Sequence, residues 1–181
     1  MGAPQGDPYP PATAADLAAC AAQLGRPVRG VVGVAHRCAC GLPDVLVTRP
    51  RLDDGTPFPT TFYATCPRLT GAISTLEGTG VMREMTARLA DDPKLATAYV
   101  AAHRDYLARR DALGDVPELH GVSAGGMPTR VKCLHVLVAH ALAAGPGVNP
   151  LGDEALAMLD DWWAAGPCVE ALDDSSGPGP A

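Results

Sequence analysis

Residues 131–144 read VKCLHVLVAHALAA and form the least polar segment of the chain. A segment so rich in valine, leucine and alanine predicts a helix that is buried around most of its circumference. Pro128 precedes it, and we place this proline in the first helical turn, where the absence of an amide hydrogen does no harm. We therefore expect this helix to be the centre of the core.

Three short β-strands are expected on the N-terminal side of this helix. Residues 28–37 are β-branched and interrupted by glycine, residues 45–48 read VLVT, and residues 60–65 read TTFYAT. Asp54 and Gly55, between the second and third of these segments, form a typical turn signal. The pattern predicts a small, mostly antiparallel three-stranded sheet.

Helical periodicity and end signals account for most of the remaining chain. Leu17, Cys20, Ala21 and Leu24 recur with helical spacing before Gly25, which favours a first helix that buries Cys20 as a packed apolar residue. Further helices are expected over residues 67–77, 81–91, 93–113 and 152–165, the last of which carries Trp162 and Trp163. The predicted fold class is α+β, a small three-stranded sheet packed against about five helices.

The length of 181 residues suits one domain with a substantial core. Residues 1–12 and 170–181 are rich in proline, glycine, serine or aspartate, so we expect disordered tails there. The single domain is predicted to span residues 13–169.

The composition argues against several classes of partner. The formal net charge is −6 and no dense basic stripe occurs, so we expect no nucleic-acid binding. No cationic, apolar leader and no long apolar run is found, so we expect no membrane insertion and a cytoplasmic location. A reducing cytoplasm disfavours structural disulfides, which leaves metal binding, catalysis or packing to explain the six cysteines.

Four of these cysteines form a candidate metal-binding set. Cys38 and Cys40 project the same way from the end of the first strand, and Cys66 precedes Pro67 as a candidate helix N-cap. A helix N-terminus near Cys66 and cationic neighbours of Cys133 would favour their thiolate forms. The set Cys38, Cys40, Cys66 and Cys133 suits zinc, or alternatively an iron-sulfur cluster, with His135 and Cys168 as reserve ligands.

Other readings of the same residues remain open. The cysteines could simply fill the core, as small apolar residues do. In a thiol-dependent enzyme, Cys133 or Cys66 would be the nucleophile and His135 or His140 the base. A non-enzymatic interaction protein would instead expose an apolar patch, for which Trp162 and Trp163 are the candidates.

Residues 123–132, SAGGMPTRVK, are a candidate anion site. Gly125 and Gly126 would leave backbone amides free before a helix, and Arg130 and Lys132 would add positive charge. An anionic small molecule is therefore a possible partner of this loop. The alternative is a plain turn in which the two glycines only allow the chain to enter the helix.

The segments FPTTFYATCPRL, GVMREMTARL, SAGGMPTRVKCLH and GPGVNPLGDEA, within residues 23–168, resemble actinobacterial members of the domain of unknown function family 501. The resemblance implies no established reaction, cofactor or catalytic residue. Relatives are often encoded near a septum-formation-initiator-like protein, an exopolyphosphatase-like enzyme and enolase, which favours roles linked to phosphate, cell division or the envelope. The resemblance does not decide whether Cys40 belongs to the metal set.

Overall fold

The computed structural model describes residues 8–170 and contains one three-stranded antiparallel sheet. Its strands are β1 (Val31–Arg37), β2 (Pro43–Thr48) and β3 (Phe62–Ala64), in the order β1-β2-β3. The predicted α+β class and antiparallel sheet are confirmed. The strand bounds differ, since β1 begins later than expected, β2 begins earlier and β3 is shorter.

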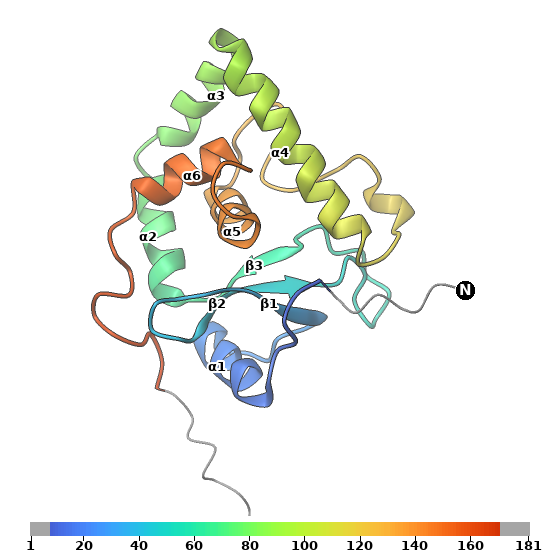
Figure 1. The fold of residues 1–181 in the computed structure, drawn as a ribbon, viewed down its shortest axis with the longest axis vertical. Coiled ribbons are helices and arrows are strands. Elements are labelled where there is room, and N and C mark those ends of the chain that lie inside the picture. Colours follow the sequence, from blue (N-terminus) through green and yellow to red (C-terminus); the bar gives the residue numbers. More distant parts are fainter. Residues whose placement is uncertain (1–7, 171–181) are drawn as a thin grey trace, which may run out of the picture.

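Helices cover both faces of this sheet (Figure 1). One helix, α1 (Ala14–Leu24), lies on one face, and the remaining helices lie on the other side, with α5 nearest the sheet (Figure 1). The helices on that side are α2 (Pro67–Glu77), α3 (Val81–Asp91), α4 (Pro93–Asp111), α5 (Leu134–Ala144) and α6 (Pro150–Ala157). A short 3-10 helix, η1 (Pro117–Leu119), follows α4.

Local signals explain the helices whose bounds were predicted. Helix α1 begins with a capping box, in which Thr13 and Asp16 bond each other's backbone amides, and ends at Gly25 in a left-handed conformation. Helix α4 begins at Pro93 because the side chain of Asp92 accepts the amides of Lys94 and Leu95. The predicted bounds of α2 and α3 are confirmed.

The central helix begins later than predicted. Pro128 lies outside α5, whose N-cap is Cys133. The amide of Lys132 donates to the carbonyl of Gly125 at 2.7 Å, and the amide of Arg130 donates to the carbonyl of Gly126 at 3.1 Å. These bonds close the preceding residues into a compact loop, so the helix cannot start within it.

The last helix is shorter than predicted and excludes both tryptophans. Helix α6 starts at Pro150, where the Asn149 side chain accepts the amide of Gly152, and it ends at Ala157. Trp162 and Trp163 follow in a turn, where their rings meet edge to face with centroids 4.5 Å apart. Both are half-buried, and Trp162 packs against the core, so the exposed tryptophan patch is not found.

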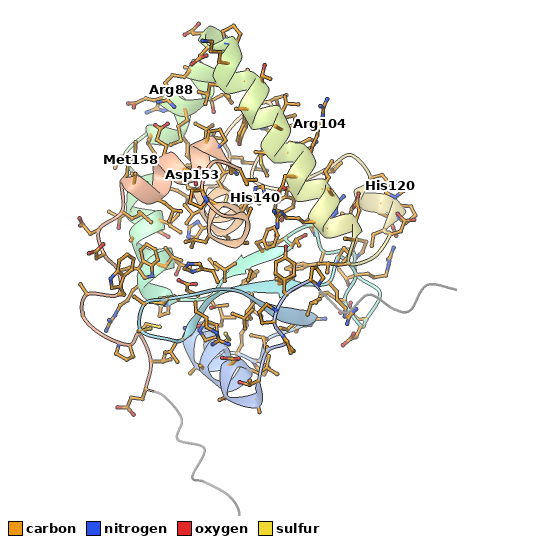
Figure 2. All side chains as sticks on the ribbon, viewed as in Figure 1. Arg88, Arg104, His120, His140, Asp153 and Met158 are labelled. Carbon is orange, nitrogen blue, oxygen red and sulfur yellow. The ribbon has the colours of Figure 1, made fainter. Side chains whose placement is uncertain are left out.

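The core lies between α5 and the sheet and includes one histidine (Figure 2). His140 on α5 is fully buried, stacked on Phe62 and edge-on to Tyr106. Its Nε2 lies 2.8 Å from Oδ2 of Asp105, and its Nδ1 lies 3.2 Å from Nδ2 of Asn149. The amide donates to Nδ1, so Nε2 carries the hydrogen, and burial lowers the pKa of His140.

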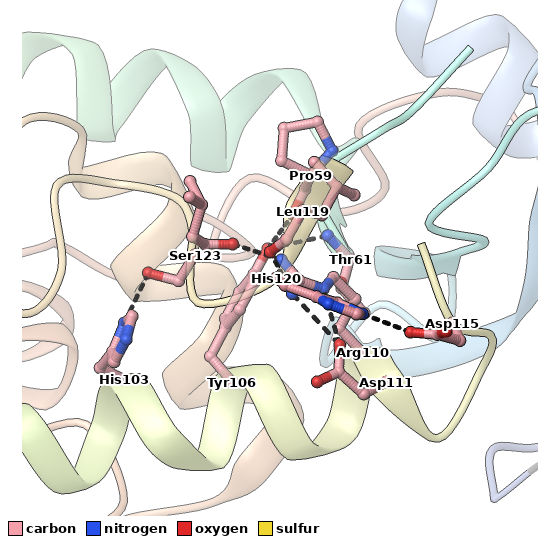
Figure 3. Close-up of polar contacts among 11 residues, drawn as sticks. Pro59, Thr61, His103, Tyr106, Arg110, Asp111, Asp115, Leu119, His120 and Ser123 are labelled. Atoms are coloured by element: carbon pink, nitrogen blue, oxygen red, sulfur yellow. Dashed lines mark hydrogen bonds and ion pairs between the residues drawn. The ribbon is translucent and has the colours of Figure 1, made fainter. Parts of the chain in front are cut away.

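Buried polar side chains of α4 hold the neighbouring loops in place (Figure 3). The hydroxyl of Tyr106 donates to the carbonyl of Pro59 at 3.1 Å and accepts the amide of Thr61 at 2.8 Å. Arg110 is 1% exposed and donates to the carbonyls of Leu119 and Val122. A charged side chain at this depth is stabilised because its hydrogens meet carbonyl oxygens.

The N-terminal residues that are described pack on the sheet. The carbonyl of Pro10 accepts the amide of Val34 at 2.9 Å, and the ring of Tyr9 lies edge-on to Phe62. Gly33 permits this approach, since a Cβ there would lie 2.5 Å from the carbonyl oxygen of Pro10. The rest of the predicted tails, residues 1–7 and 171–181, lies outside the described residues.

Candidate functional site

The four predicted metal-binding cysteines do not come together. Cys38 and Cys40 contact each other in the turn between β1 and β2, where the amide of Gly41 donates to the carbonyl of Cys38. Cys66 is the N-cap of α2 and Cys133 is the N-cap of α5. Among residues 8–170 the four cysteines do not form a group of potential metal ligands.

Cys66, which is buried, contacts the reserve ligand Cys168, which is partly exposed. Cys66 is 1% exposed, and burial raises the pKa of its thiol to about 12 in spite of the helix N-terminus. The expected thiolate at this N-cap is therefore wrong, because the loss of hydration outweighs the helix dipole. Cys20 is fully buried as predicted, and burial raises the pKa of its thiol to about 11.

One group of potential metal ligands is present among residues 8–170. It consists of Glu77, Cys133 and His135, whose ligand atoms lie within 4.8 Å of one another. Glu77 is the last residue of α2, whereas Cys133 and His135 lie at the start of α5. Two of the three residues were predicted, Cys133 as a ligand and His135 as a reserve.

The packing of α2 on the core places Glu77 beside Cys133 and His135. Leu69 and Ile73 of α2 are fully buried, and the helix therefore delivers its C-terminal residue to the N-terminus of α5. Oε1 of Glu77 accepts the amide of Leu134 at 2.7 Å, which satisfies one of the free amides of α5. The positive end of α5 also stabilises the Glu77 carboxylate.

The ring of His135 is held from both sides. Its Nδ1 lies 3.3 Å from Oε1 of Glu77, and its Nε2 lies 3.2 Å from the carbonyl oxygen of Thr70. A carbonyl oxygen only accepts hydrogen bonds, so Nε2 carries a hydrogen and Nδ1 faces the other members of the group. The neighbouring Cys133 and Glu77 raise the pKa of His135 to about 9, against the effect of burial.

The group opens into a cleft with a volume of 340 Å³. Cys133 and His135 contribute to its wall, and both are partly exposed. The other lining residues come from the end of α1, the region of β3 and the first turns of α2 and α5: Leu24, Thr60, Phe62, Tyr63, Ala64, Thr70 and Val136. A small molecule could therefore reach the thiol and the imidazole.

The predicted anion loop has a packing role. Gly125 and Gly126 have φ angles of +72° and +93°, and a Cβ on Gly126 would lie 2.8 Å from the carbonyl oxygen of Arg130. The amides of Arg130 and Lys132 donate to carbonyls within the loop, so they do not face a ligand. The side chains of Arg130 and Lys132 are exposed. Anion binding by this loop stays a prediction.

The structure removes one residue from the predicted site, His140, and adds another, Glu77. His140, a candidate base, is 0% exposed and already bonded through both ring nitrogens, so it cannot serve a nucleophile at the cleft. Glu77 was missed, although a signal exists for it. An acidic residue at a helix C-terminus is unfavourable for that helix, so its presence there indicates a partner elsewhere.

Together, the fold and the site define an α+β protein in which a partly exposed Glu-Cys-His group lies at the meeting point of two helices. The chain belongs to the family described as "Protein of unknown function (DUF501)", which it matches over residues 34–157. The match includes all three residues of the group and confirms the resemblance to this family. No curated protein and no solved structure matches the chain. No helix between residues 8 and 170 is both long and apolar enough to span a membrane.

Proposed function

We propose that this protein binds one zinc ion through Glu77, Cys133 and His135. Carboxylate oxygen, thiolate sulfur and imidazole nitrogen are the three donor types that zinc takes in proteins. The orientation of His135 is the observation that carries the proposal. Its Nε2 donates to the Thr70 carbonyl while its Nδ1 faces Glu77, as expected for a histidine ligand held by a backbone acceptor.

The spacing of the donors fits a zinc ion. Zinc–nitrogen and zinc–oxygen bonds of about 2.0–2.1 Å at a tetrahedral angle separate the two donor atoms by about 3.4 Å. Nδ1 of His135 and Oε1 of Glu77 lie 3.3 Å apart. The bond from the Leu134 amide to the same carboxylate fixes its position. Glu77 and His135 therefore need little movement to bind the ion.

Three protein ligands leave one tetrahedral position for another molecule. Structural zinc sites are closed by four protein ligands, whereas sites that act on substrates keep one position open. The cleft beside Cys133 and His135 supports the open type. An iron-sulfur cluster is disfavoured here because only one thiol belongs to the group.

A thiol-dependent enzyme is the second candidate function. The raised pKa of His135 favours an imidazolium beside Cys133 at the N-terminus of α5, and a cysteine paired with a histidine is a common arrangement in thiol-dependent enzymes. The Glu77 carboxylate, however, shares His135 with Cys133, and Nε2 faces the Thr70 carbonyl, which suits metal binding better than proton transfer to and from Cys133 alone.

The test is metal analysis of protein purified without oxygen, without a metal-affinity tag and without chelators. We expect about one zinc per chain, and its loss in the variants Cys133→Ser and His135→Asn. Cys40→Ser is the matched control, since Cys40 is also partly exposed but lies in the β1–β2 turn. Full zinc content in Cys133→Ser would exclude this site.

Alkylation separates the two functions. If Cys133 is a nucleophile, zinc-free protein should lose one thiol to iodoacetamide near neutral pH much faster than free cysteine does, and His135→Asn should slow this reaction. If Cys133 is a zinc ligand, addition of zinc should protect it, and Cys40 should react equally with and without the metal.

A further inference from the structure

The cleft beside the Glu-Cys-His group has apolar walls. Phe62, Tyr63 and Ala64 of the edge strand line it together with Cys133, His135 and Val136 at the start of α5. Its remaining polar residues, Thr60 and Thr70, are uncharged. Leu24, the last residue of α1, adds to the apolar surface. Figure 1 shows β3 beside α5 and α2, the elements that enclose this space. The residues that line the cleft therefore favour an apolar occupant.

The lining of this cleft contains no lysine, arginine, aspartate or glutamate. The neighbouring cavity of 290 Å³, which shares Leu24 and Tyr63 with it, differs in this respect because Arg26 and Arg29 line it. When His135 is a neutral zinc ligand, a phosphate group that entered the first cleft would lose hydration without gaining a cationic side chain from the walls. The cleft is thus poorly suited to a phosphorylated small molecule.

The charge of the loaded group leads to the same conclusion. A zinc ion contributes two positive charges, and Cys133 thiolate and Glu77 carboxylate contribute one negative charge each. His135 is neutral when it is a ligand. The charges cancel, so the loaded site has no net attraction for a phosphate dianion and gains most from an apolar ligand with a single metal-binding donor.

We infer that the cleft binds a small apolar thiol, whose sulfur occupies the open zinc position while its apolar part lies between Tyr63 and Val136. This inference rests on the proposed zinc site. A thiol fits because zinc in a site that already includes a cysteine accepts sulfur readily. The thiol binds as a thiolate, and its proton passes to solvent.

Cobalt-loaded protein provides the test, because sulfur and nitrogen ligation of Co²⁺ can be followed by visible absorption. We would titrate it with 2-phenylethanethiol, with 2-mercaptoethanol and with inorganic phosphate. The first two probes share the donor and differ in the apolar group. We expect 2-phenylethanethiol to bind at least about tenfold more tightly than 2-mercaptoethanol, and phosphate to leave the spectrum unchanged.

Two variants assign the difference to the cleft. Tyr63→Ser should remove most of the preference for 2-phenylethanethiol, with the cobalt spectrum before titration unchanged. Leu52→Ser is the matched control, since Leu52 lines only the neighbouring cavity, and it should keep the preference. Equal binding of the two thiols, or tighter binding of phosphate, would overturn the inference while the metal site stands. A chain that binds no cobalt would instead refute the metal site and this inference with it.

Discussion

Nδ1 of His135 lies 3.3 Å from Oε1 of Glu77, although 58 positions separate the two residues in the chain. The contact joins the C-terminal end of α2 to the first turn of α5. It connects the packing of two helices to the chemistry of the cleft, because the same carboxylate oxygen caps α5 through the amide of Leu134. A substitution of Glu77 that keeps this cap of α5 can therefore lower the metal affinity of the site while leaving the stability of the fold nearly unchanged.

Glu77→Gln is that change. The glutamine oxygen can still accept the Leu134 amide, so we expect the free energy of unfolding of the zinc-free protein to fall by less than about 1 kcal/mol. The negative charge of a direct ligand is lost, so zinc affinity should fall at least about 100-fold. Calorimetric titration with zinc and urea unfolding measure the two effects.

Glu154→Gln is the control for this prediction. Glu154 of α6 forms a solvent-accessible ion pair with Arg88 of α3, and it is not part of the group. The zinc affinity of the Glu154→Gln protein should equal that of the wild type. Equal affinities for zinc in Glu77→Gln and Glu154→Gln would remove Glu77 from the ligand set.

The helix ends show what the sequence could predict. Pro67 and Gly78 bracket α2 with local signals, and its bounds were predicted correctly. Residues 158–165 contain no glycine or proline, so nothing local marks the end of α6 at Ala157, and the predicted helix continued through both tryptophans. At Pro128 a local helix signal was present, but the hydrogen bonds of the glycine loop prevailed.

The candidate site was also predictable only in part, because local signals mark some of its residues and tertiary packing brings in the others. Cys133 and His135 are two positions apart and belong to residue types that bind metals, so both were singled out. Glu77 joins them through the packing of α2 against α5, which no local pattern shows. The predicted contact of Cys133 with Cys38, Cys40 and Cys66 also required tertiary packing, and there the structure pairs Cys66 with Cys168 instead.

Asn149→Ala tests the buried polar contacts behind the site. Asn149 is fully buried, caps α6 through Gly152 and donates to Nδ1 of His140. The variant loses a cap worth about 1 kcal/mol and leaves a buried ring nitrogen without its donor, at a cost of about 1–3 kcal/mol. We expect urea unfolding to show that the free energy of unfolding falls by about 2–4 kcal/mol in total.

Asp92→Ala is the control, because it removes the exposed cap of α4 and should lose only about 1 kcal/mol. Equal losses in both variants would contradict a role for the His140 contact.

Asp16 makes the stability of the fold depend on pH in the acidic range. Two hydrogen bonds from Arg37, at 2.7 and 2.8 Å, lower the pKa of this buried carboxyl from 3.8 to about 2, with burial acting in the opposite direction. Because the folded pKa lies below the unfolded value, the resulting stability is present above pH 4 and is lost as the pH falls toward 2. Arg37 is partly exposed, so solvent screening limits the contribution to about 1–2 kcal/mol.

Asp16→Asn is the corresponding variant, and unfolding by urea at several pH values is the measurement. Near neutral pH we expect it to be less stable than the wild type by about 1–2 kcal/mol, with the difference vanishing between pH 4 and pH 2. Asp91→Asn, which changes an exposed carboxylate on α3, should follow the wild-type curve. A constant difference between Asp16→Asn and the wild type down to pH 2 would show that the Arg37 pair does not set the acid response.

Gly126→Ala tests whether the glycine loop positions Cys133. The new Cβ would lie 2.8 Å from the carbonyl oxygen of Arg130 and 3.0 Å from the amide nitrogen of Lys132, at a φ of +93°. Gly121→Ala is matched in its backbone conformation, with a φ of +69°, but has open space around the new Cβ. The left-handed conformation costs both variants about 1–2 kcal/mol, and only Gly126→Ala also forces the loop apart.

We therefore expect Gly126→Ala to lose at least about 1 kcal/mol more stability than Gly121→Ala. Because the displaced loop runs directly into Cys133, zinc affinity should also fall in Gly126→Ala, while Gly121→Ala keeps the wild-type value. Urea unfolding of the zinc-free proteins and zinc titration of the same samples separate the two effects. If Gly126→Ala lost stability but bound zinc as tightly as the wild type, Cys133 would be positioned by α5 alone and the loop would serve only to close the fold.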